Sequence, residues 1–212
     1  SGKERQILIF YWLSPLLIFI TYWHGQLDLL PTVLLLLGFY FIKLRNFKFA
    51  GFIFGITIAT KLSMALALPF PIIYLSQNKR LRSALYPFCF STIITVILLV
   101  IFPIFLEGYR IMVLGTPLIK SLFWLSLNNS SEYKIYLLPL IFFFLIYSFW
   151  RLERTNFDLL LSMTGISFLV AVLMMPPTPG WYLWSLIFLI LYQINADYKG
   201  KILVSFFSIV VT

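Results

Sequence analysis

The chain is a succession of apolar runs separated by short polar breaks, and this pattern constrains its fold more than any other feature. Only 11% of its 212 residues are charged, whereas a soluble domain carries about 25%. A soluble protein could not cover so much Phe, Leu and Ile with so little polar surface, so lipid is the solvent that suits this composition. The sequence therefore predicts an all-α, polytopic transmembrane helical bundle.

A bilayer core needs about 20 apolar residues per helix, and somewhat fewer for short helices. We expect about eight to nine spans in one domain over residues 1–212, with a long outer loop at 107–134. The chain begins at Ser1-Gly2 and stops inside an apolar run, so we also expect it to be a piece of a longer protein. The apolar runs cover residues 7–23, 29–42, 49–60, 62–75, 85–106, 135–150, 159–175, 181–194 and those from 202 onward.

The basic residues predict an orientation, because loops rich in Lys and Arg stay on the cytoplasmic side. The polar breaks fall into two alternating sets along the chain. One set holds twelve of the 16 basic residues and the other holds four. The basic residues form no continuous face, which argues against nucleic acid as a partner despite a net charge of +9. We expect a multi-pass protein of a bacterial or archaeal plasma membrane, rather than of the endoplasmic reticulum. The basic breaks, expected to be cytoplasmic, lie at residues 1–6, 43–48, 77–84, 151–158 and 195–201.

The first outer break gathers His24, Gln26 and Asp28. If the second helix starts early, His24 and Asp28 are four residues apart and share a helix face. On one interpretation Asp28 only caps that helix and His24 is an interfacial residue. On the other, the three side chains open into a polar cavity that binds a sugar or a phosphate, because ionisable groups near a membrane core are costly and usually functional.

Lys61 stands among apolar residues between the third and fourth runs, which are short and resemble a hairpin of short or tilted helices. Its ammonium could simply reach the outer interface along a buried stem. It could instead bind a phosphate, since charge attraction strengthens where water is excluded. Upstream, Gly51 and Gly55 have the small-xxx-small spacing that is typical of close helix packing.

Two further outer segments carry candidate residues. In the loop 107–134, Arg110 could meet a phosphate headgroup or anchor the interface, and Phe123 and Trp124 suit a helix lying on the membrane. In the segment Pro176-Pro177-Thr178-Pro179-Gly180, the prolines stiffen the chain before Trp181 and Tyr182. These two rings could form an interfacial belt, or they could be aimed at a fixed place where aromatic rings stack on a sugar.

Several of these segments, in this order and spacing, resemble the polytopic GT-C glycosyltransferases. The likeness is closest to prokaryotic relatives of the mannosyltransferase that adds the second mannose of GPI anchors, and it covers roughly residues 20–80 and 175–190. The segments are His24-Gly25-Gln26-Leu27-Asp28 with Leu30-Pro31, Ala50-Gly51-Phe52-Ile53-Phe54-Gly55-Ile56 leading to Lys61-Leu62, Pro69-Phe70, and Pro179-Gly180-Trp181-Tyr182-Leu183-Trp184.

The resemblance implies a transferase that takes a sugar such as mannose from a polyprenyl- or dolichyl-phosphate donor on the outer or luminal face. His24, Gln26, Asp28 and Lys61 would line its cavity, with Lys61 at the lipid phosphate, whose developing charge a cation stabilises. The family's catalytic base commonly lies in a first outer loop near the N-terminus. This chain has no such loop before Ile7, so Asp28 is the best acid available for that role.

Three functions stay open at this stage. The first is the glycosyltransferase, with a lipid-phosphate-linked sugar as donor and membrane lipid as its surroundings. The second is a transporter or flippase of lipid-linked or small polar substrates, since transporters often use interrupted helices. The third is a noncatalytic membrane subunit that docks partner subunits. The sequence has no Cys/His metal cluster and identifies no certain cofactor, although a divalent metal in the transferase stays open.

Overall fold

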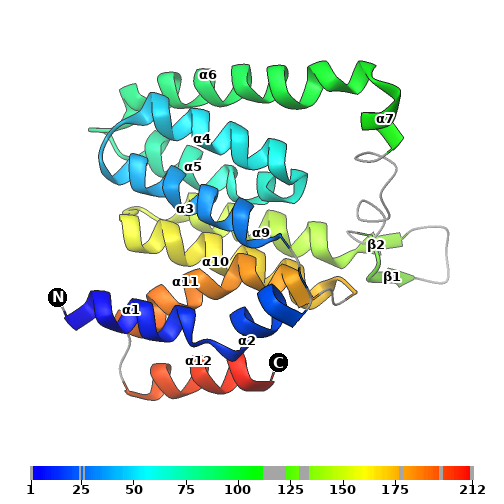
Figure 1. Ribbon diagram of the computed structural model, residues 1–212. Coiled ribbons are helices and arrows are strands. Elements are labelled where there is room, and N and C mark those ends of the chain that lie inside the picture. The colour runs from blue at the N-terminus through cyan, green and yellow to red at the C-terminus, as the bar shows by residue number, and fades with distance from the viewer. Residues whose placement is uncertain are drawn as a thin grey trace.

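The computed structural model describes residues 2–23, 25, 27–111, 123–128, 134–176, 179–195 and 198–210, and it is mostly helical (Figure 1). Each predicted apolar run contains at least one helix. The α-helices are α1 (Gly2–Trp12), α2 (Pro15–Ile18), α3 (Leu29–Lys43), α4 (Phe47–Thr60), α5 (Pro69–Gln77), α6 (Leu85–Val96), α7 (Glu107–Tyr109), α9 (Leu137–Arg151), α10 (Phe157–Met174), α11 (Tyr182–Asn195) and α12 (Tyr198–Val210).

Two helices are long and apolar enough to cross a membrane, Arg82–Phe105 and Phe157–Met174. The first of these is α6 preceded by a 3-10 turn and continued by a π-helical and a second 3-10 turn. A third span results if the two helical segments of residues 5–23, bent by 52° at a short break, count as one. Five further helices are apolar but shorter. These findings on the described residues indicate membrane association, and the eight or nine spans stay a prediction.

Within the described ranges, the fold departs from all-α at a short antiparallel pair of strands. Strand β1 (Ser126–Asn128) pairs with β2 (Lys134–Tyr136). The expected helix at Phe123 and Trp124 is wrong, since both residues lie in irregular chain just before β1. The Phe123 ring instead meets Tyr136 of β2 edge-on at 5.0 Å between centroids, so the chain before β1 packs against the second strand.

The helices run roughly antiparallel, so their connections gather at two opposite ends (Figure 1). One end holds the start of α1 and the α3–α4, α5–α6 and α9–α10 connections, and we call it the basic end. The opposite end holds the start of α3, the turn between α4 and α5, the strands, and the start of α11. The two sets of breaks that differ in charge thus lie at opposite ends of the bundle. The basic residues of the basic end include Lys43, Arg45, Lys48, Lys79, Arg80, Arg82, Arg151 and Arg154.

Helix α4 packs closely between α3 and α6, and glycine permits the approach. A Cβ added at Gly51 would collide with the carbonyl oxygen of Phe88 on α6, and one added at Gly55 would lie 2.5 Å from Cβ of Thr95. The Thr92 hydroxyl donates to the Gly51 carbonyl at 3.1 Å across the same interface. The packing interpretation of this glycine spacing is therefore confirmed, and α4 lies directly against α6 at Gly51 and Gly55.

Candidate functional site

Asp28 occupies the N-cap position of α3, but its carboxylate makes no capping hydrogen bond among the described residues. The residue is 8% exposed. Its carbonyl oxygen accepts a hydrogen bond from the Thr32 hydroxyl at 2.8 Å, one helical turn further on. The backbone of Asp28 is thus fixed by α3, while its side chain is free to serve a partner outside the helix.

Lys61 lies where α4 is interrupted. The carbonyl oxygen of Thr57 accepts from the Thr60 hydroxyl at 2.7 Å and from the Lys61 amide at 3.2 Å. Threonine hydroxyls that bond back to the helix compete with regular helical bonding. Lys61 itself is extended, at φ −156° and ψ 113°, and a 3-10 turn over Leu62–Ala67 follows it. The interruption turns the lysine stem away from the axis of α4 and toward α3.

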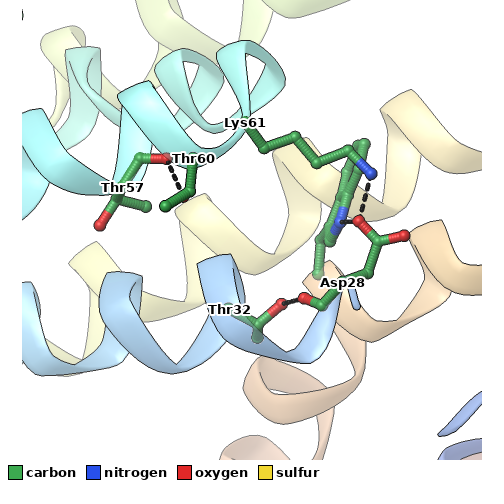
Figure 2. A network of polar contacts seen from close by, with 6 residues as sticks. Asp28, Thr32, Thr57, Thr60 and Lys61 are labelled. Carbon is green, nitrogen blue, oxygen red and sulfur yellow. Dashed lines mark hydrogen bonds and ion pairs between the residues drawn. The ribbon is translucent and has the colours of Figure 1, made fainter. Parts of the chain in front are cut away.

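The two charged groups form an ion pair, and Trp184 on α11 completes it. Lys61 Nζ donates to Asp28 Oδ1, and the Trp184 indole N–H donates to the same oxygen at 3.2 Å. Figure 2 shows the ammonium reaching across from the end of α4 to the start of α3, with the second carboxylate oxygen of Asp28 directed away from it. The Asp28 side chain is 9% exposed and that of Lys61 21%. The pair is therefore largely withdrawn from solvent.

Two indole rings flank the ammonium. Lys61 Nζ lies 4.6 Å from the centroid of the Trp184 ring and 5.9 Å from that of Trp181. The two rings are stacked, with centroids 5.5 Å apart, and Trp184 is fully buried. A cation over an indole face is attracted by the ring quadrupole, and the attraction grows as water is removed. The rings therefore help to hold a charge in an otherwise apolar place.

The structure brings together three of the residues singled out from the sequence, Asp28, Lys61 and Trp181. His24 and Gln26 lie outside the described residues. Helix α3 begins at Leu29, so Asp28 stands just before it, and the helical face expected to join His24 to Asp28 involves a residue outside the described part of the chain.

The remaining two candidate residues have different surroundings. Tyr182 begins α11, is half-buried and packs against the hydrophobic core. Arg110 follows α7 and is exposed. Figure 1 places α7 at the same end of the bundle as the start of α3, as the sequence predicted for Arg110. No contact between Arg110 and Asp28 or Lys61 is described.

Sequence reasoning missed Trp184 as a site residue. The signal was available, because Trp181 and Trp184 are three residues apart and side chains at that spacing share a helix face. What the sequence could not supply is which face of α11 turns toward α3, since nearly every residue of α11 is apolar.

An ion pair beside two stacked indole rings can do two things chemically. Its ammonium has three N–H donors, so it can bind a phosphate oxygen as well as a carboxylate. Its carboxylate has a second oxygen that can accept a proton from a hydroxyl. Among the described residues, no group of three or more His, Cys, Asp or Glu side chains could hold a metal ion.

Comparisons of the chain with protein-family models, with curated proteins and with solved structures find no match. The likeness to GT-C glycosyltransferases therefore depends on the quoted motifs, and function must be argued from the site.

Proposed function

We propose that the chain belongs to a membrane glycosyltransferase that takes a sugar, such as mannose, from a polyprenyl- or dolichyl-phosphate donor. The acceptor is bound on the extracytoplasmic face of a bacterial or archaeal plasma membrane. The observation that carries this proposal is the Asp28–Lys61 pair, largely buried beside Trp181 and Trp184. It lies at the end of the bundle opposite the basic connections (Figure 1). A base and a phosphate-binding cation side by side are the two groups that such a transfer requires.

In the proposed step the acceptor hydroxyl oxygen bonds to the anomeric carbon of the sugar, and the bond from that carbon to the phosphate oxygen breaks. The bonding electron pair goes to the phosphate oxygen, where Lys61 stabilises the added negative charge. The hydroxyl proton goes to a carboxylate oxygen of Asp28. The products are the glycosylated acceptor and the free polyprenyl phosphate.

The test measures sugar transfer in membranes that contain the protein. Radiolabelled polyprenyl-phosphate sugars, beginning with mannose, are supplied together with a lipid-linked or a protein acceptor. Loss of a positioned base lowers a rate by about 10²–10⁴-fold, and loss of one charge-stabilising group by about 10²–10³-fold. We therefore expect Asp28→Asn and Lys61→Ala each to abolish measurable transfer while the protein still accumulates in the membrane.

Trp150→Phe is the matched control. Trp150 is 55% exposed and lies in the last turn of α9, at the basic end of the bundle. Its transfer rate should equal that of the wild type. Unchanged transfer in both site variants would remove the assignment of the site. A wild-type protein that transfers no sugar from any polyprenyl-phosphate donor would remove the proposed function.

One observation favours a second candidate, a transporter of lipid-linked or small polar substrates. The chain is interrupted at Lys61 between two short apolar helices, and broken helices commonly form transport sites. Purified protein in liposomes separates the two functions. A transporter would move the polyprenyl-phosphate sugar between leaflets with its sugar still attached, whereas a transferase would leave the donor in its leaflet and consume it.

A further inference from the structure

Lys61 and Trp184 both donate to one oxygen of Asp28, but they differ in how freely each can leave it. Resting on the proposed function, we infer that Lys61 exchanges Asp28 for the donor phosphate when the donor binds. We further infer that Trp184 is a positioning residue that keeps Asp28 in place during this exchange. An ammonium that bound the Asp28 carboxylate and the donor phosphate at the same time would also fit the proposed function. The exchange is therefore a separate claim about the site.

Lys61 is the partner that can move. Its side chain is 21% exposed, against 9% for Asp28. Its ammonium ends a flexible four-carbon stem with three rotatable donors, and the stem begins at an extended residue rather than within a helix. A short displacement of Nζ along the indole faces would therefore carry the charge toward a bound anion without moving α3, α4 or α11.

Trp184 is the partner that cannot move. It is fully buried, with Trp181 stacked on it and the Phe168 ring 5.9 Å away at a steep angle. Its indole N–H is a donor only, so it holds the ionised carboxylate without competing for a proton. Because Thr32 fixes the backbone of Asp28 from below, the carboxylate keeps its position after the ammonium has left.

The exchange assigns a different role to Asp28 before and after the donor binds. Before the donor binds, the pair neutralises two charges that would be costly to bury separately. Once the phosphate has taken the ammonium, the carboxylate keeps the Trp184 N–H as its described donor. Asp28 is then held in place with oxygen lone pairs open to the acceptor hydroxyl.

The inference makes a prediction that simple cooperation between the two residues does not. If Asp28 competes with the phosphate for Lys61, then removing its charge must strengthen phosphate binding even though it abolishes transfer. We expect Asp28→Asn to bind a polyprenyl phosphate in detergent micelles about tenfold more tightly than the wild type, equivalent to about 1.4 kcal/mol of lost competition. Lys61→Ala should lose that binding. The uncharged polyprenol is the control ligand, and its affinity should be equal in all three proteins.

Trp184→Phe tests the positioning residue, because it keeps a six-membered ring beside Lys61 and removes the N–H donor together with the five-membered ring of the indole. We expect its affinity for polyprenyl phosphate to change less than threefold, whereas kcat for sugar transfer should fall about 10²-fold, within the range of a misplaced base. Trp150→Phe makes the same substitution at an exposed position and should alter neither. A purely structural role of Trp184 would instead lower affinity, kcat and thermal stability together.

A second measurement needs only the folded wild type. Withdrawal of the ammonium from its place 4.6 Å from the Trp184 centroid should change tryptophan fluorescence when polyprenyl phosphate is added, and Trp184→Phe should lack that change. Equal or weaker phosphate binding by Asp28→Asn, or an unchanged emission on binding, would overturn the exchange. These outcomes do not depend on catalysis, so they stay distinct from a failure of the proposed transferase activity.

Discussion

Removing the Lys61 ammonium should destabilise the protein more than removing the Asp28 charge. In Lys61→Met the stem is kept and the charge is lost, which leaves a carboxylate that is 9% exposed with the Trp184 N–H as its described donor. In Asp28→Asn the remaining ammonium keeps 21% exposure and two indole faces. The charge that remains in Lys61→Met is therefore more deeply buried and has fewer described partners than the charge that remains in Asp28→Asn.

The magnitudes follow from this burial. Breaking a fully buried ion pair by removing one partner costs about 3–5 kcal/mol. The indole donor and the partial exposure of the pair reduce this, so we expect about 2–3 kcal/mol for Lys61→Met. For Asp28→Asn we expect about 1 kcal/mol, because cation–π attraction to the indoles offsets part of the loss. In a chain of this length each kcal/mol shifts Tm by about 2–4 °C.

The assay is thermal unfolding of the purified protein in detergent, followed for the wild type, both single variants and Lys61→Met/Asp28→Asn. The double variant carries neither charge and should be more stable than Lys61→Met alone, which defines a favourable coupling between the two residues. Strict additivity of the two single effects would show that the groups are not paired. A larger loss in Asp28→Asn than in Lys61→Met would refute the burial argument.

Two further stability predictions use matched positions in the same unfolding assay. Gly51→Ala should cost about 1–3 kcal/mol, because its new Cβ would meet the backbone of α6, whereas Gly108→Ala, with nothing within 4 Å, should stay within about 0.5 kcal/mol of the wild type; equal effects would contradict the tight α4–α6 contact. Asn156→Ala should cost about 1 kcal/mol, because Asn156 caps α10 through a 2.7 Å bond from the Leu159 amide. Asn46→Ala should cost less than half of that, because the corresponding bond is 3.4 Å long. A larger loss of stability in Asn46→Ala than in Asn156→Ala would contradict this reasoning.

The sequence predicted most helices well because each apolar run stops at charged or polar residues. Helix α3 ends at Lys43 and α10 ends at Met174, each within one residue of its predicted end. The strands β1 and β2 were not predicted, since they are only three residues long and lie in a loop without alternating polarity. Contacts between distant positions, such as Phe123 with Tyr136, cannot be read from a local pattern.

The candidate site was predicted as separate residues but not as a pair. Asp28 and Lys61 stood out because charge is rare in this chain, yet they are 33 positions apart and either could have faced solvent. Their pairing depends on the interruption of α4, which arises from the hydroxyl bonds around Thr57 and from the extended Lys61 backbone. Trp184 was overlooked because its spacing from Trp181 does not say which face of the apolar helix α11 turns toward α3.

The central claim is that the Asp28–Lys61 end of the bundle opens to the compartment opposite the basic connections. Its most direct test is cysteine labelling with a membrane-impermeant maleimide in intact cells, after Cys89→Ser removes the only cysteine. Leu27→Cys and Glu107→Cys report on one end, and Lys79→Cys and Arg154→Cys on the other; all four positions are exposed. The first two should react from outside, and the last two only after permeabilisation. Labelling that puts residues 27 and 107 on different sides of the membrane, or residue 27 on the same side as residue 79, would contradict the claim.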